Sequence, residues 1–329
     1  MSFRTCACLP FVFIVTACSA WGLELTPFAV RNFSPPSIVH GLPIAETARL
    51  LNAGQVSARV SLDLSNIATD NTAKDELIYL DGETHVVTAG LRYGINDQLQ
   101  LGLDLPWVSQ SEGFLDSFIK DFHDWFGLPD GDRKDMENDQ IEYLYQRNGD
   151  TRLFLDDEVD GLGDIRLLLA WQYARSDNSA VALQAQVKLP TGDADKLTGS
   201  EAFDVALSLS AQRDFPLSIG QGAVWAGAGI SYLGDGDVIE DDVEDFAASG
   251  WLGSGWQPLD WLALKLQLDV HSALYDSDLT ELGDPAVILT MGGSIGIGEK
   301  TFLDLGVGED LNINASPDVT FHLALQHQF

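Results

Sequence analysis

The chain ends in D-V-T-F-H-L-A-L-Q-H-Q-F, residues 318–329, a stretch that alternates apolar and polar residues and stops on an aromatic. Successive side chains of an extended strand point to opposite faces, so Val319, Phe321, Leu323, Leu325 and Phe329 share one face. A transmembrane β-barrel needs a regular amphipathic strand at this position, because its last strand closes against its first. The ending therefore favours a barrel if the rest of the chain repeats the pattern.

The same alternation recurs along most of the chain and predicts about twelve strands. Most have the length that a tilted strand needs to cross a bilayer, about 9–11 residues. The pattern is weakest in the stretch 248–258. The predicted spans are 54–65, 84–95, 98–108, 163–174, 180–190, 202–213, 221–233, 248–258, 261–273, 285–296, 300–308 and 318–329.

The connections between these strands sort into two classes. Short links carry turn residues, such as Asn96-Asp97 and Ser176-Asp177-Asn178. Long links fall at 66–83, 109–162, 191–201, 234–247, 274–284 and 309–317. Short turns at one end and long loops at the other are typical of outer-membrane barrels, whereas the loops of a soluble sandwich need not sort by end. We therefore predict an all-β chain with a single transmembrane antiparallel β-barrel over residues 54–329.

The N-terminal residues precede the predicted barrel. Residues 1–20 have the charged start, apolar centre and small-residue end of a signal peptide. A second interpretation stays open, because Val15-Thr16-Ala17-Cys18 resembles a lipoprotein box and would leave Cys18 acylated. All three cysteines lie in this segment. Residues 21–53 are expected to form a periplasmic extension or a plug inside the barrel.

The charge balance excludes one class of partner. The chain has 50 acidic and 18 basic residues and a net charge of −32, so no nucleic-acid-binding surface is expected. Much of the acid lies in predicted external loops, including 109–162 and 234–247. Either these loops are simply solvated, or they bind divalent cations that bridge them to lipid phosphates. The run Asp156-x-Glu158-x-Asp160-Gly161 partly mimics a calcium loop, but Leu167 stands where its bidentate Glu belongs.

The polar face of the strands should line the lumen, and it carries charges of both signs. Two interpretations stay open: the charges pair across the wall and stiffen it, or they line a narrow polar pathway. An eight-stranded barrel fills with side chains and a 16-stranded barrel leaves a channel, so twelve strands do not decide between them. The lumen-lining candidates are Arg59, Asp63, Arg92, Asp104, Asp164, Arg166, Lys188, Asp204, Lys265, Asp269 and Asp304.

The longest predicted loop contains an amphipathic helix. Large apolar residues recur at helical spacing, and Gly127-Leu128-Pro129 ends the pattern. Such an apolar face must be buried, either over the mouth of the barrel or on the lipid surface. The flanking acids favour the mouth, so we expect this helix to cap it and restrict flow. Its apolar residues are Phe114, Leu115, Phe118, Ile119, Phe122 and Phe126.

No catalytic, cofactor or metal site is predicted. Gly292-x-Ser294-x-Gly296 matches a nucleophile-elbow string, but it falls inside a predicted strand rather than at a strand-to-helix turn. His85 is the histidine best placed for a rim hydrolase, yet no obvious partner accompanies it. The favoured function is passive passage of small solutes, amphipathic or hydrophobic. The alternatives are a non-conducting structural or surface-binding barrel and an outer-membrane hydrolase.

Three motifs carry a resemblance to a known family. They are P-F-A-V-R-N-F-S-P-P-S-I-V-H-G-L-P (27–43), F-H-D-W-F-G-L-P-D-G-D-R (122–133) and K-L-P-T-G-D-A-D-K-L-T-G-S (188–200). In this order they resemble an uncharacterised domain-of-unknown-function family of proteobacterial outer-membrane barrels. The last motif is similar to one in barrels linked to aromatic-hydrocarbon degradation. The resemblance implies an outer-membrane location and transfers no activity.

Location and partners follow from this fold. We expect export by the signal peptide to the outer membrane of a Gram-negative bacterium, in contact with lipid and lipopolysaccharide. The ending resembles the C-terminal signal of outer-membrane barrels, so Phe329 should engage the barrel-assembly machinery. The sequence leaves the oligomeric state and the solute open.

Overall fold

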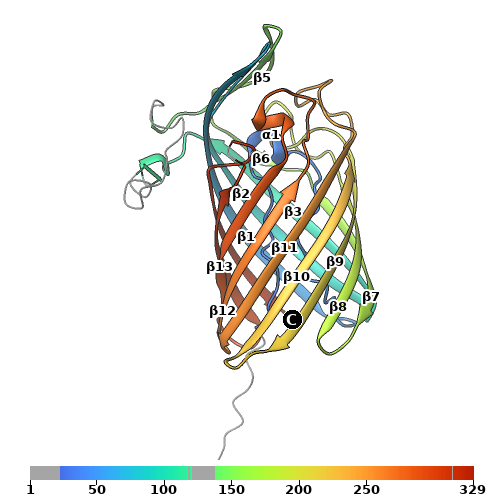
Figure 1. Cartoon of the computed structure of the whole chain (residues 1–329). Coiled ribbons are helices and arrows are strands. Elements are labelled where there is room, and N and C mark those ends of the chain that lie inside the picture. Colours follow the sequence, from blue (N-terminus) through green and yellow to red (C-terminus); the bar gives the residue numbers. More distant parts are fainter. Residues whose placement is uncertain (1–22, 118, 121–137, 313) are drawn as a thin grey trace, which may run out of the picture.

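The computed structural model describes residues 23–117, 119–120, 138–312 and 314–329. It is a closed antiparallel β-barrel, which confirms the predicted fold class (Figure 1). The described strands are β1 (Val56–Ala73), β2 (Glu76–Asn96), β3 (Leu99–Ser111), β4 (Glu142–Arg147), β5 (Asp150–Leu155), β6 (Val159–Leu162), β7 (Arg166–Arg175), β8 (Ser179–Lys188), β9 (Asp204–Pro216), β10 (Gln221–Tyr232), β11 (Phe246–Leu259), β12 (Leu262–His271), β13 (Ala286–Gly296), β14 (Thr301–Asp310) and β15 (Val319–Gln328).

The barrel closes where its first and last strands meet. β1 pairs with β15 from Ser57 opposite Gln328 to Asn66 opposite Val319. The backbone N–H of Phe329 donates to the carbonyl of Val56 at 2.9 Å, so the terminal residue is tied to the start of β1. Of the described strands, β4, β5 and β6 are additions at the long-loop end, and the other twelve form the wall. The role of Phe329 in assembly stays a prediction.

Side chains alternate across the wall as the sequence pattern predicts. Along β9, buried and exposed residues alternate from Asp204 to Gln212. Exposed Tyr93 and Trp171 lie near the short turns, and exposed Trp107 and Tyr232 near the long loops. These aromatics mark the two interfaces of a lipid-facing band. Outer-membrane barrels have short periplasmic turns and long external loops, so the short-turn end is here called the periplasmic end and the long-loop end the external end.

The long-loop end contains more strand than the sequence pattern predicts. The span 66–83, expected to be a loop, is mostly the extension of β1 and β2, whose pairing continues to Ala73 opposite Glu76. The reason is that Ile78 and Leu80 are fully buried in this extension and pack in one apolar cluster with β4. The predicted loop 109–162 likewise contains β4, β5 and β6. Figure 1 shows that the part of the chain that contains β5 projects beyond the barrel.

The weakest predicted strand, 248–258, is a regular strand of the wall, β11. Its alternation is hard to recognise because two inward positions are glycines. A Cβ on Gly253 would lie 2.2 Å from the indole Nε1 of Trp225, and one on Gly255 would lie 3.2 Å from the same ring. The glycines therefore leave space for a lumenal tryptophan from β10.

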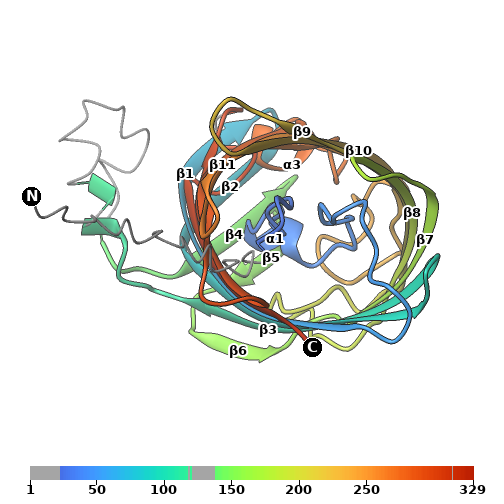
Figure 2. The same cartoon turned by 90° about the horizontal axis from the view of Figure 1, so that it is seen from below.

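Helix is scarce in the described residues. The labelled helices are α1 (Pro35–Ile38) and α3 (Thr280–Gly283), each four residues long. Among the residues that the structure describes, no helix has the length and hydropathy that a transmembrane helix requires. Seen along the barrel axis, the N-terminal segment lies inside the cylinder (Figure 2). The predicted signal peptide, residues 1–20, lies outside the described residues.

The lumen and its N-terminal plug as candidate functional site

Residues 23–53, here called the plug, run through the lumen as a hairpin. The ascending limb starts near the periplasmic end, where Gln212 of β9 donates to the carbonyl of Leu25 at 3.0 Å. The turn contains α1, which lies near the external end of the barrel (Figure 1). The descending limb returns to the periplasmic turn after β2, where the N–H of Ala53 donates to Asp97 at 3.1 Å. The plug thus spans the lumen twice.

The ascending limb is held by backbone and amide hydrogen bonds. The N–H of Phe28 donates to Oε1 of Gln267 at 2.9 Å, and Nε2 of Gln267 donates to the carbonyl of Phe28 at 2.9 Å. Higher up, Nδ2 of Asn32 donates to Nε2 of His271 at 3.0 Å and to the carbonyl of Ala315 at 2.9 Å. A buried polar backbone needs such partners, because each unpaired group would cost about 1–3 kcal/mol.

The upper part of the descending limb contacts charged residues of the wall. Nζ of Lys188 donates to the carbonyl of Val39 at 2.8 Å and pairs with Asp164 at 2.9 Å and Asp204 at 3.1 Å. The N–H of Gly41 donates to Oδ2 of Asp204 at 2.6 Å. Only glycine allows this approach, because a Cβ at position 41 would lie 2.7 Å from Cβ of Asp204. Val39 and Gly41 belong to the motif 27–43 and Lys188 begins the motif 188–200, so the two motifs meet in the lumen beside Asp164 and Asp204.

The lower part of the descending limb forms ion pairs. Glu46 lies 2.5 Å from Nη2 of Arg92 and 4.0 Å from Nη2 of Arg59. Arg92 also pairs with Asp104 at 2.8 Å. Glu46 and Arg92 border a small cavity of 70 Å³ between the plug and the wall at the periplasmic end. Glu46, Arg59 and Arg92 are only partly buried, whereas Asp104 is buried.

Six inward residues on six neighbouring strands are each paired in register with the next, and five of them are charged. They are here called the charged ladder, in the order Arg59, Gly90, Asp104, Arg166, Lys188 and Asp204. Because barrel strands tilt against the axis, this line climbs from the periplasmic side to the external ends of β8 and β9. Gly90 gives room for the pairing, since a Cβ there would lie 2.8 Å from Oδ1 of Asp104.

The other lumenal candidates pair on the opposite arc of the wall. Lys265 pairs with Asp304 at 3.0 Å, and its Nζ lies 3.9 Å from the ring centroid of Phe28. Asp63 pairs with Nδ1 of His322 at 2.6 Å. Asp269 accepts from Nε2 of Gln267 at 2.9 and 3.1 Å. The structure therefore brings most candidate charges into contact with one another, with other inward side chains of the wall or with the plug.

The predicted lumen residues all lie on the inward face of the wall or at its external end, where Asp164 precedes β7. Arg166 is the exception to direct pairing within the described residues: it is buried, and its Nε has no hydrogen-bond partner. The neutral groups that hold the plug were not predicted. The recurrence of glutamine on the inward face of the strands could have indicated them. The glutamines that bind plug backbone are Gln100, Gln172, Gln186, Gln212 and Gln267.

An apolar cluster closes the external mouth. Ile38 and Leu42 of the plug pack in it with Tyr143 of β4 and with Ile239 and Tyr275 of two external loops. Tyr275 is 1% exposed, and its hydroxyl donates to the carbonyl of Pro36 at 2.7 Å. The cluster, here called the mouth seal, joins the turn of the plug to β4, to β5 and to the external loops that contain Leu197, Ile239 and Tyr275. At the external end the lumen is therefore closed by packed apolar side chains.

The predicted mouth-cap helix lies elsewhere as far as it is described. Leu115 and Ile119 are buried against Val319, with Leu64 and Phe321 packed beside them, on the outer face of the wall. The backbone N–H groups of Phe114 and Leu115 donate to Oε1 of outward-facing Glu83. The expectation that this segment caps the mouth is therefore wrong for its described part, because the apolar rim of the wall offers the same burial. Phe118, Phe122 and Phe126 lie outside the described residues, as does the whole motif 122–133.

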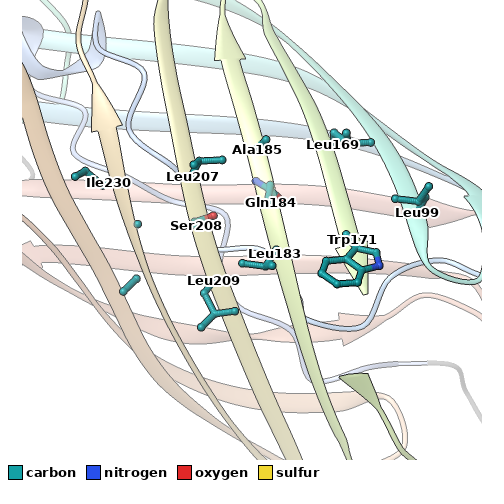
Figure 3. A pocket seen from close by; sticks show the side chains of 12 residues that line it. Leu99, Leu169, Trp171, Leu183, Gln184, Ala185, Leu207, Ser208, Leu209 and Ile230 are labelled. Carbon is teal, nitrogen blue, oxygen red and sulfur yellow. The ribbon is translucent and has the colours of Figure 1, made fainter. Parts of the chain in front are cut away.

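The outer wall also carries an apolar groove. It has a volume of 620 Å³ and is bordered by Trp171, Leu183, Leu207 and Ile230 on strands β7 to β10 (Figure 3). Small residues, among them Ala185 and Ala228, also line the groove, so it lies where small side chains separate large ones. Its position on the lipid-facing side matches space for an acyl chain. It does not connect the lumen with the bilayer, because β7 to β10 are paired along this stretch.

The described residues contain no arrangement that favours catalysis or metal binding. Ser294 of the nucleophile-elbow string is buried in β13, and its hydroxyl donates to Asp304. His85 faces outward and pairs with Glu83 at 2.8 Å. Within the described ranges, no group of three His, Cys, Asp or Glu residues could hold a metal ion. Cation binding by the acidic external loops stays a prediction.

Comparison with known proteins identifies the fold and the family. The COG4313 outer membrane channel from Pseudomonas putida F1 has a TM-score of 0.55 and is 14% identical, with 86% of this chain and 98% of that chain covered. The Ralstonia pickettii toluene transporter TbuX, at TM-score 0.40 and 10% identity, covers 94% of this chain and 97% of its own. The first likeness shows the fold, and the second is too distant to carry an argument. Among curated proteins, none matches this sequence.

The family model described as "Protein of unknown function (DUF3187)" matches residues 4–329. This match spans the plug, the wall strands and the two motifs that meet in the lumen. The chain therefore belongs to the DUF3187 family.

Proposed function

We propose that this protein is an outer-membrane channel for small solutes whose lumen is closed by the plug in the conformation described. The proposal includes export by the predicted signal peptide and insertion in the outer membrane of a Gram-negative bacterium. Its support is the closed barrel with a lipid-facing band and a polar interior, the arrangement that water-filled outer-membrane channels require. The protein acts in this proposal without catalysis, since Ser294 and His85 lie in unrelated buried and outward positions.

One observation carries the proposal: the wall is complete without the plug. Every wall strand pairs with a wall strand on both sides, from β1–β2 round to β15–β1. The plug contributes no strand to this ladder and contacts the wall through side chains. Removing it would therefore leave the backbone hydrogen bonds of the cylinder intact. A purely structural barrel would gain more from an apolar core than from a lumen lined with ion pairs, whose burial is costly.

The interior also indicates a class of solute. Charges of both signs line the path beside the descending limb, with Arg59 and Arg92 below and Lys188 and Asp204 above. Polar walls of this kind favour small hydrophilic or amphipathic solutes that can exchange hydrogen bonds with the wall. Apolar side chains, including Trp225, Trp251 and Phe302, also face the lumen below the mouth seal, so an amphipathic solute would find both kinds of contact there.

The test is a disulfide between the plug and the wall. A Cβ at position 41 would lie 2.7 Å from Cβ of Asp204, which is shorter than the about 3.5–4.5 Å of a disulfide, so the plug must move away from the wall by about 1 Å when the bond forms. The natural chain has no cysteine after Cys18, so Gly41→Cys/Asp204→Cys introduces the only pair beyond the predicted signal peptide. We expect liposome swelling with a small sugar, and planar-bilayer conductance, to fall at least tenfold on oxidation and to return on reduction.

The oxidised and reduced forms have the same sequence, so lost side-chain contacts cannot cause the difference. Asp204→Cys alone is the matched control and should not respond to oxidant. If neither form of the pair conducts and the wild-type chain does not either, the protein is no channel. Equal conductance of the two forms would show that solutes bypass the plug.

A further inference from the structure

His271 of β12 binds the upper part of the plug, and its hydrogen bonds determine its charge state. Oδ1 of Asn32 accepts from the N–H of Ser34 at 2.9 Å, so the amide orientation of Asn32 is fixed. Its Nδ2 therefore donates, and Nε2 of His271, at 3.0 Å, must accept. Nδ1 of His271 lies 2.7 Å from the carbonyl of Ser272 and must donate. His271 is neutral in the closed state, because a proton on Nε2 would point at the amide hydrogen of Asn32.

A second histidine at the mouth seal is neutral for the same kind of reason. The hydroxyl of Tyr275 has one proton, which it donates to the carbonyl of Pro36. Nε2 of His40, 2.8 Å from this hydroxyl, must therefore be the donor in their bond. Nδ1 of His40 is buried without a partner in the described residues. Burial, followed by the charge of Lys188, lowers the pKa of His40 to about 3.

The charged groups around the two rings oppose a further positive charge. The positive charges of Lys188 and Arg31, and His271 when it is protonated, all oppose a charge on His40. The nearby carboxylates are already engaged: Asp164 and Asp204 pair with Lys188, and Asp269 accepts from Gln267. Tyr275 and Asn32 face the rings from the loop and the plug and are uncharged. Protonation of His40 or His271 would thus add a cation beside Arg31 without a free partner.

We propose that His40 and His271 form an acid-released latch, in which protonation of the two rings frees the upper plug and opens the lumen. This inference rests on the proposed channel function. In the released plug each ring returns to solvent, where an ordinary histidine has a pKa of about 6.5. The released state therefore binds more protons than the closed state below about pH 6.5, so acid favours release. The ratio of released to closed plug should rise up to about tenfold per pH unit for each histidine.

The experiment measures plug motion and conductance separately. Ala29 is half-buried on the ascending limb, and a nitroxide on Ala29→Cys would report plug mobility without thiol chemistry that varies with pH. In lipid, both the mobile fraction of its spectrum and the planar-bilayer conductance should rise at least tenfold from pH 7.5 to pH 5. The variant His40→Gln/His271→Gln keeps a donor at 40 and an acceptor at 271 but cannot titrate, so both readouts should stay flat.

His85→Gln is the matched control, since it makes the same exchange on the outer face and should keep the acid response. A heat-modifiable gel shift establishes that each variant is folded. If the double variant still responds to acid, the latch is wrong and another group, such as His322, is the sensor. If the wild-type spectrum and conductance are both flat with pH while the channel conducts, the latch is wrong and the channel stands. Acid-induced mobility without conductance at any pH would support the latch and overturn the channel.

Discussion

The two ends of the lumen are closed by different chemistry. At the periplasmic end, Glu46, Arg59 and Arg92 are partly exposed, and Glu46 and Arg92 border a cavity. At the external end, Ile38 and Tyr275 are 3% and 1% exposed within the mouth seal. An ion pair that keeps access to solvent contributes about 0–1 kcal/mol, whereas burial of one large apolar side chain contributes about 1.5–3 kcal/mol. The difference indicates that the external end holds the plug, and that the periplasmic end only aligns it.

The largest effect within this comparison should come from the mouth seal. Tyr275→Ala would remove a fully buried ring together with the partners of Pro36 and His40. Truncating a buried aromatic costs about 3–5 kcal/mol, so the ratio of open to closed plug should rise more than about a hundredfold. Planar-bilayer recordings would show this as a rise in open probability. Tyr275→Phe, which removes only the hydroxyl, should cost about 1–3 kcal/mol and lie between it and the wild type.

A smaller effect should follow at the periplasmic end. Glu46→Gln would break the contacts of Glu46 with Arg59 and Arg92, but Arg92 keeps its pair with Asp104 at 2.8 Å. With solvent screening, the loss should be about 1 kcal/mol, or roughly fivefold in the open ratio. Liposome swelling can resolve a change of this size. If Glu46→Gln opens the channel more than Tyr275→Ala, the periplasmic end holds the plug and the comparison above is reversed.

Much of the barrel could be predicted from alternation alone, because a strand with one face in lipid and one in a polar lumen must alternate. Parity along each strand also assigned Arg59, Asp104 and Lys188 to the lumen. Their partners could not be predicted, because these depend on strand tilt and register across the barrel, which a single strand does not encode. The register that aligns Arg59 with Asp204 appears only when six neighbouring strands are assembled.

The path of the plug was beyond sequence reasoning for a related reason. Residues 23–53 have no strict period, since their backbone is satisfied by glutamines of distant strands, such as Gln267 and Gln186. The segment around Leu115 shows a second limit. Its apolar spacing indicates a buried face, but the mouth and the outer rim can both bury it, and the rim residue Phe321 packs there.

The most direct test of the account is the conductance of a chain that lacks residues 23–50. This deletion removes both limbs of the plug and leaves all twelve wall strands. The account predicts a heat-modifiable, folded barrel with steady single-channel conductance at pH 7.5 and no acid dependence, while the full-length chain is mostly closed at that pH. A folded deletion variant that stays as silent as the full-length chain would contradict the account, as would a full-length chain that already conducts equally well.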